Sequence, residues 1–150
     1  KIVLRNSRKM SDDGARLLMR AIDNESNASM EGLTTASMKS MKNNMLQQLG
    51  MGREQLTAAH AKLRAYRFIE DLDALRYGAY VRWFDLTRDE PRLTNGGIVC
   101  DMVVTDTGVS VRCKNQFHRM FSFNLSECMV FQKLSEQELV LLSALDYLNS

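Results

Sequence analysis

The chain of 150 residues has few of the residues on which catalytic and metal-binding sites depend. It has only two histidines, so a nucleophile with a positioned base has few candidates. Its three cysteines, Cys100, Cys113 and Cys128, are odd in number and widely spaced, which argues against a disulfide framework and for a reducing, intracellular setting. No CxxC pair is present, and buried unreactive thiols are commoner than a zinc site. We therefore expect no catalytic residue, no metal and no cofactor.

Long apolar runs and an excess of one charge are also missing. No run approaches the length of a membrane span, and the apolar start of the chain is too short for a signal peptide. Because the chain opens at Lys1 rather than Met, a missing leading segment stays an open alternative. Residues 1–76 carry 13 Lys and Arg against 9 Asp and Glu, and residues 77–150 carry 7 against 9. A dedicated nucleic-acid-binding protein is usually more basic.

What the chain does contain indicates a folded protein. A hydrophobic fraction of 45% and a charged fraction of 25% are ordinary for globular domains, so wholesale disorder is excluded. No internal repeat is visible. Ten methionines are unusual, and Met either fills gaps in a core or lines adaptable binding surfaces.

Apolar residues three and four positions apart predict three helices in the first half. The first covers residues 11–23, with Ser11 as its cap, and a polar connector follows at 24–37. The third covers residues 53–76 and would be about 35 Å long. Such a long apolar stripe needs a partner. The second helix has a methionine face formed by Met38, Met41 and Met45, with Leu49.

At about Tyr77 the hydrophobic period changes from 3.6 to two, which predicts strands. Ser135 and Glu138 then form a capping box that begins a last helix. We expect an α+β fold, with a helical region at 1–76 and a small five-stranded antiparallel barrel at 77–150. The barrel would resemble the Src-homology-3 or Tudor type and be closed by the C-terminal helix. The predicted strands are 80–86, 98–105, 109–114, 120–125 and 128–133.

One hairpin has a predicted register. If its tip is formed by residues 106 and 107, Asp101 faces Arg112 and Met102 faces Val111, so that a charge pair and an apolar pair coincide. The same register places Cys100 opposite Cys113. The Thr94–Gly97 stretch is predicted to be a turn, with Asn and Gly able to take a positive φ.

The residues with the best claim to function are aromatic and basic. One group lies on the first predicted strand, and the other surrounds Phe117. Three interpretations of these residues are possible: they fill the barrel interior, they bind a protein, or they stack on the bases of a single-stranded nucleic acid. The acidic cluster at 85–90 is interpreted as solvated. The candidate partner-binding residues are Tyr80, Arg82, Trp83, Lys114, Phe117, His118, Arg119 and the methionine face Met38, Met41 and Met45.

Three stretches carry a family resemblance. Residues 76–83 (RYGAYVRW), 93–99 (LTNGGIV) and 130–135 (VFQKLS), with Glu138, resemble uncharacterised conserved proteins of large nucleocytoplasmic DNA viruses. The resemblance covers about the second half of the chain and supplies no catalytic residue. It implies a minor capsid or other virion-associated protein, located in the virion or in virus factories of the host cytoplasm. We therefore expect a non-enzymatic structural protein that binds other virion or scaffold proteins or a second copy of itself. Binding of nucleic acid is the alternative.

Overall fold

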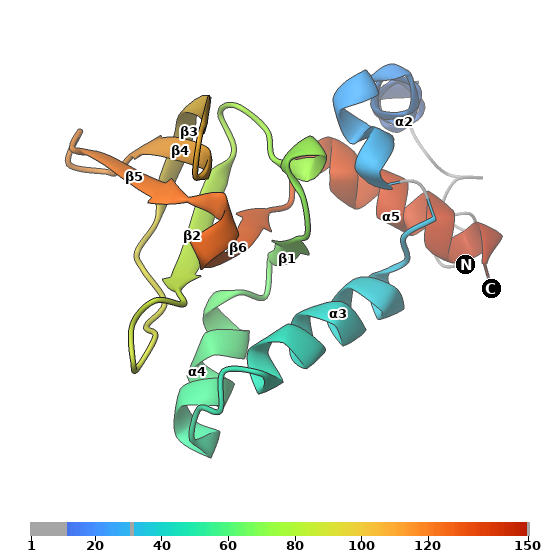
Figure 1. Ribbon diagram of the computed structural model, residues 1–150. Helices are drawn as coiled ribbons and strands as arrows, with labels where there is room; N and C mark the ends of the chain where they lie inside the picture. The colour runs from blue at the N-terminus through green and yellow to red at the C-terminus, as the bar shows by residue number, and fades with distance from the viewer. Residues whose placement is uncertain (1–11, 31, 150) are drawn as a thin grey trace. The chain divides into compact units, whose positions relative to one another are not determined.

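A computed structural model describes residues 12–30 and 32–149 and shows a mixed helix and sheet protein (Figure 1). The chain divides into two compact units. The first unit runs to Met41 and resumes at Leu134, and the second unit is Lys42–Lys133. Helix α3 (Thr35–Gln47) begins in the first unit and ends in the second. The predicted α+β class is confirmed, and none of the described helices is both long and apolar enough to cross a membrane.

The first unit is helical. The predicted first helix is confirmed as α2 (Asp12–Asp23), although its expected cap, Ser11, lies outside the described residues. The expected polar connector contains a 3-10 helix instead, η1 (Glu25–Met30). It is ordered there because Met30 packs with Met38 and Leu142 in the core of this unit.

Helix α5 (Glu136–Leu148) begins where its local sequence predicts. The Ser135 hydroxyl accepts a hydrogen bond from the Glu138 amide at 3.1 Å, and the Glu138 carboxylate accepts one from the Ser135 amide at 2.9 Å. This reciprocal pair satisfies two backbone donors that the helix itself leaves unpaired. The predicted capping box and the presence of a C-terminal helix are therefore confirmed, but α5 belongs to the first unit and not to the unit that contains the sheet, so its expected role in closing a barrel is not confirmed.

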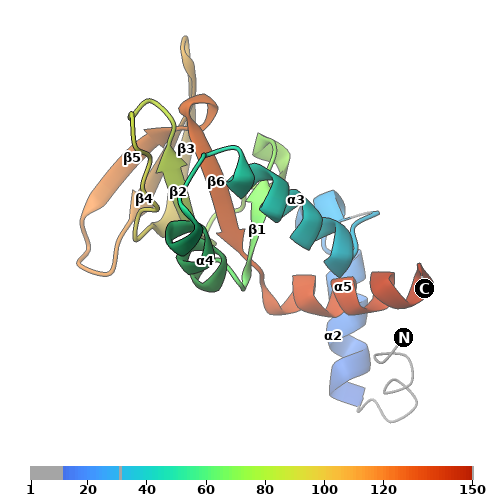
Figure 2. The same cartoon turned by 90° about the horizontal axis from the view of Figure 1, so that it is seen from below.

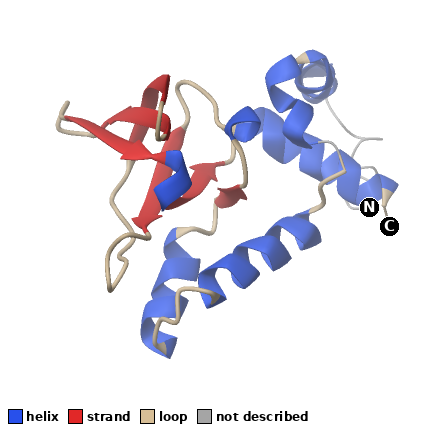
Figure 3. Cartoon of the chain, viewed as in Figure 1, coloured by secondary structure: helices blue, strands red, loops and turns tan. Residues whose placement is uncertain are grey.

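Six strands form one antiparallel sheet in the second unit, in the order β1-β6-β2-β3-β4-β5 (Figures 1 and 3). Consecutive strands from β2 to β5 are neighbours, and the 3-10 turn η3 (Leu125–Glu127) returns the chain so that β6 lies between β1 and β2. The strands are β1 (Tyr66–Ile69), β2 (Tyr80–Asp85), β3 (Gly97–Thr105), β4 (Gly108–Lys114), β5 (Met120–Asn124) and β6 (Cys128–Lys133).

The five predicted strands are all present, but the closed five-stranded barrel is not confirmed. β1 and β5 are the two edges of the sheet, which is therefore open. The prediction missed β1 because this strand was included in the expected long helix. A sixth strand beside β6 gives β6 a neighbour on each side and leaves β5 at the opposite edge.

The long helix predicted at 53–76 is wrong. Helix α4 (Arg53–Lys62) ends after ten residues, and Tyr66–Ile69 continues as β1 (Figure 3). The run Tyr-Arg-Phe-Ile is aromatic and β-branched, and it gains four paired positions by lying against β6. At residues 66–69, apolar side chains at helical spacing therefore form a strand instead of a helix, because pairing with β6 outweighs their weak local preference for a helix.

The end of α4 is held by a buried lysine. The Lys42 ammonium donates hydrogen bonds to the carbonyl oxygens of Leu63 at 2.9 Å, Arg64 at 3.4 Å and Tyr66 at 3.0 Å. The last carbonyls of a helix have no partner inside the helix, and a cation is favoured at that end. Lys42 thereby fixes the turn that changes the chain from helix to strand.

Apolar side chains cover both faces of the sheet. Successive residues of a strand point to opposite faces, so Trp83 enters one core and Phe84 the other. Helix α4 and the end of α3 pack against the second face, where Leu46 and Leu63 meet Phe84 (Figures 1 and 2). Burial of each large side chain contributes about 1.5–3 kcal/mol. The first core is Ile69, Ala74, Leu75, Val81, Trp83, Val99, Val111, Cys113, Phe123 and Val130.

The predicted hairpin is confirmed in its tip and in most of its register. Asp101 pairs with Arg112 and Met102 with Val111, as expected. The pairing of Cys100 with Cys113 is wrong, because a bulge between Val99 and Asp101 shifts the register and places Val99 opposite Cys113. The bulge leaves the thiol of Cys100 exposed, while that of Cys113 is buried.

Candidate functional site

A groove lies at the open side of the sheet, between edge strand β5 and residues 92–96. It consists of two hollows of about 420 and 460 Å³ that share Trp83, Thr94 and Phe121 in their linings. We call these two hollows together the seam groove. The first hollow is lined by Tyr80, Arg82, Trp83, Thr94, Asn95, Gly96, Asn115, Gln116, Phe117 and Phe121. Four of these ten residues are aromatic, and Arg82 is the only ionised one.

The floor of the groove belongs to the core. Trp83 stacks on Phe123, with ring centroids 4.3 Å apart and an interplanar angle of 29°. Only 8% of Trp83 is exposed. An offset stack of this kind adds about 0.5–1.5 kcal/mol to the burial of both rings. Trp83 therefore supports the groove and offers a partner little more than one edge.

One wall is built by hydrogen bonds between β2 and the segment at 94–95. The Thr94 amide donates to the Trp83 carbonyl at 2.9 Å, and the Trp83 amide donates to the Thr94 hydroxyl at 3.1 Å. Arg82 Nε donates to the Thr94 carbonyl at 2.8 Å, and the Tyr80 hydroxyl donates to the Asn95 carbonyl at 2.7 Å. These four bonds hold the wall in one conformation.

Gly96 makes this wall possible. Its φ is 80°, and a side chain at this position would overlap the backbone oxygen of Val81. Only glycine combines a positive φ with such a close backbone approach at low cost. Of the turn predicted at 94–97, only the positive φ of Gly96 is confirmed; residues 94–96 form no regular turn, Leu93 is bridged to Phe84, and Gly97 already belongs to β3.

The opposite wall carries a phenylalanine that the turn before β5 presents to solvent. Phe117 is 71% exposed. The side-chain oxygen of Asn115 accepts hydrogen bonds from the amides of Phe117 and Arg119, both at 2.9 Å. The Asn115 amide donates to the Arg119 carbonyl at 2.9 Å, and His118 adopts a positive φ of 62°. An exposed ring is therefore held on a hydrogen-bonded turn.

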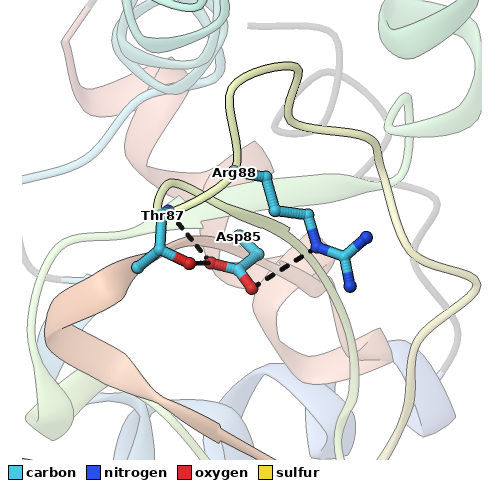
Figure 4. Close-up of polar contacts among 3 residues, drawn as sticks. All are labelled: Asp85, Thr87 and Arg88. Carbon is cyan, nitrogen blue, oxygen red and sulfur yellow. Dashed lines mark hydrogen bonds and ion pairs between the residues drawn. The ribbon is translucent and has the colours of Figure 1, made fainter.

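The lining of the second hollow includes Asp85 and Arg88, whose polar contacts with each other and with Thr87 are drawn in Figure 4. The Asp85 carboxylate accepts hydrogen bonds from the Thr87 hydroxyl at 2.6 Å and the Thr87 amide at 3.0 Å. Arg88 lies 3.7 Å from the same carboxylate. The hydrogen bonds from Thr87, with the nearby Arg88 charge, hold the pKa of Asp85 below its usual value. This local network starts the connector that runs from β2 to the groove.

The thiols of Cys113, which is buried, and of Cys128, which is half-buried, are poor nucleophiles. Burial raises the pKa of Cys113 to about 12, and burial with the nearby Asp85 and Glu127 carboxylates raises that of Cys128 to about 12. The thiolate is the form that reacts and binds metals, so both groups stay neutral at pH 7. Within residues 12–30 and 32–149, no three His, Cys, Asp or Glu side chains are grouped closely enough to hold a metal ion.

The structure brings four of the predicted partner-binding residues together. Tyr80, Arg82, Trp83 and Phe117 line the first hollow. Lys114, His118 and Arg119 are exposed at the end of β4 and on the adjoining turn.

The methionine face contributes to cores. Met38 is buried in the core of the first unit. Met41 is half-buried, and Met45 packs against Leu46 and its neighbours in the second unit.

Phe121 is the main groove residue that sequence reasoning did not select. It was expected to share a face with Phe123; it is paired with Cys113 of β4 and lines both hollows. Phe123 is buried at the centre, whereas Phe121 is 46% exposed. Alternation within a strand indicates which face of the sheet a side chain points to. Where the groove lies along that face depends on how the strands and loops are arranged in three dimensions.

Comparison of the chain with protein-family models, with curated proteins and with solved structures found no match.

Proposed function

We propose that the chain is a non-enzymatic interaction protein whose second unit docks a partner protein in the seam groove. The observation that carries this proposal is the exposed ring of Phe117, which stands on a turn whose backbone amides are held by hydrogen bonds to Asn115. Exposing a large apolar side chain costs free energy in water, and fixing it costs entropy. Aromatic residues with an arginine are also the groups most enriched in protein interfaces.

We further propose that the second unit is an open relative of the Src-homology-3 and Tudor barrels. The supporting observation is the order of its elements. A four-stranded meander, a 3-10 turn and a return strand beside the first strand of the meander follow one another from β2 to β6. This order is the one expected for such small barrels, many of which are binding modules. The additional strand β1 distinguishes this unit from them.

A nucleic-acid-binding role is the alternative. It is favoured by the combination of rings, the guanidinium of Arg82 and three amide side chains in one hollow. Single strands bind by stacking bases on aromatic residues in a positive groove. Against it, the linings of the two hollows contain three arginines and two carboxylates, which is a small excess for a phosphate-binding surface.

A site-specific photo-crosslinker tests the docking proposal. It is placed at position 117 in the full chain, and a matched chain carries it at Val104, which is 78% exposed on β3 and outside the groove. We expect position 117 to crosslink one defined protein and position 104 to crosslink it at a much lower yield. The same protein should be lost when Phe121→Ser accompanies the crosslinker. Equal yields from both positions would contradict docking in the groove.

The location of this function is proposed from the resemblance of residues 76–83, 93–99 and 130–135 to proteins of large DNA viruses. We propose that the partner is another virion or scaffold protein and that the chain resides in the virion or the virus factory. Mass spectrometry of purified virions tests this location. Light scattering after size exclusion tests whether a second copy is also bound.

A further inference from the structure

Strand β5 is a sheet edge without the usual protection. Among the described strands it pairs with β4 alone, so every second residue directs its backbone N–H and C=O groups away from the sheet. Natural proteins protect such edges with charges, proline or bulges. The sequence of β5, Met-Phe-Ser-Phe-Asn, contains none of these. The other edge, β1, is shorter and contains Arg67.

The space in front of this edge matches an extended segment. Both hollows of the seam groove border β5, and their linings follow it from Phe121 to Asn124. Strands pair at a spacing of about 4.8 Å and rise about 3.3 Å per residue, so five residues cover about 17 Å. The large exposed apolar side chains that line the groove are Phe117 and Phe121, which offer apolar contacts to a partner. Met120, the neighbour of Phe121 on β5, is also exposed but points to the other face of the sheet.

The charges around the groove indicate the kind of segment. Its linings contain Arg82, Arg88 and Arg92 against the carboxylates of Asp85 and Glu127, and Arg88 lies 3.7 Å from Asp85, so that this pair contributes no net charge. Lys114 and Arg119 stand exposed on either side of the Phe117 turn. The surroundings therefore carry a small cationic excess, which is too small for a phosphate-binding surface but favours an acidic partner protein over a basic one.

We infer that an acidic, extended segment of the partner protein adds to the sheet as a strand beside β5. A large apolar side chain of that segment packs between Phe117 and Phe121, and its carboxylates face the arginines. This inference rests on the proposed docking function and names the kind of partner. Main-chain hydrogen bonds supply affinity in this mode of recognition, and side-chain pockets supply specificity.

Synthetic peptides test the inference on the intact chain. The probe is fluorescein-labelled Glu-Val-Glu-Phe-Glu-Val-Glu, and binding is measured by anisotropy. Two derivatives carry N-methyl groups, one on the apolar residues and one on the internal glutamates, so each removes the donors from one edge of the peptide only. We expect one derivative to bind at least about tenfold more weakly than the other, since several backbone hydrogen bonds are lost on one edge alone.

A control peptide, protein variants and NMR shifts test where on the chain the peptide binds. A peptide with lysine in place of glutamate should bind at least about tenfold more weakly. The variants Phe117→Ser and Phe117→Ser with Phe121→Ser should weaken binding, whereas the control Val104→Ser should not. In a ¹⁵N-labelled chain, the amides of Met120–Asn124 should show the largest shifts. Urea unfolding of each variant establishes that it is folded.

The outcomes separate the two proposals. If binding requires the rings but both N-methylated peptides bind equally, strand addition is wrong and docking in the groove stands. If binding is absent or does not depend on the rings, both proposals are wrong. An oligothymidine of about ten nucleotides that binds more tightly than the peptide, with a steep salt dependence, would overturn the inference in favour of nucleic acid.

Discussion

Replacing Asn115 by alanine is expected to weaken both the fold and the docking of a partner. The change removes the oxygen that accepts hydrogen bonds from the amides of Phe117 and Arg119. Each bond contributes about 0.5–1.5 kcal/mol net. Because the turn is exposed and the freed amides can bind water, we expect a loss of about 1–2 kcal/mol in the free energy of unfolding.

The effect on docking follows from the same bonds. Two backbone hydrogen bonds of the turn do not depend on the side chain at position 115. The Asn115 amide donates to the Arg119 carbonyl, and the His118 amide donates to the Asn115 carbonyl. The turn should therefore persist but become looser. Ordering the backbone of one residue again on binding costs about 1–2 kcal/mol, so affinity should fall about tenfold.

The assay combines urea unfolding with anisotropy of the acidic peptide. Asn115→Asp is the matched control, because it keeps an accepting oxygen at the same position and should retain more stability and affinity than the alanine variant. If the alanine variant loses stability but binds the peptide as tightly as the original chain, the presentation of Phe117 by this turn has no role in docking. Equal behaviour of the two variants would refute the hydrogen-bond argument itself.

Three further predictions concern the parts that position the groove. Gly96→Ala should lower the free energy of unfolding by about 3 kcal/mol or more, whereas Gly78→Ala, which has a similar φ but open space around it, should cost about 1–2 kcal/mol; urea unfolding compares them. Lys42→Met should cost about 2–3 kcal/mol in the same assay, because three carbonyls between the C-cap of α4 and the start of β1 lose a charged donor; a loss below about 0.5 kcal/mol would refute its role. Thr87→Val should raise the pKa of Asp85 towards its usual value, as followed by NMR titration of the carboxyl carbon. Because the folded pKa is lowered, the contribution of Asp85 to stability is present above about pH 4 and is lost as pH falls through the folded value, and this loss should be smaller in the variant.

Some elements could be predicted because their causes are local. The capping box of Ser135 and Glu138 begins α5 where expected, since the two groups that satisfy each other are three residues apart. Alternation of apolar residues identified the five strands after Tyr77, and the turn at residues 106–107 set most of the hairpin register. In each case the physical interaction spans only a few positions of the chain.

Other features depend on pairing between distant segments, and these were missed or misjudged. β1 forms because β6, which follows more than fifty residues later, offers it four paired positions. The bulge at Cys100 shifts the two pairs beyond it, Val99 with Cys113 and Ile98 with Lys114, in a register that is otherwise correct. The methionines of α3 were interpreted either as core-filling residues or as a face for a partner, and the structure places Met38 and Met45 against cores within the chain.

The seam groove shows the same division between local and tertiary causes. The sequence by itself determined that aromatic and basic residues gather on β2 and around the turn at 115–119, because alternation and turn chemistry are written in short stretches. Only the tertiary structure decided that Tyr80 and Phe117 line one hollow and that Phe121 completes it. The physical reason is that an unpaired sheet edge is a property of the whole strand order, and β5 became an edge only when β6 paired with β1 and β2 instead.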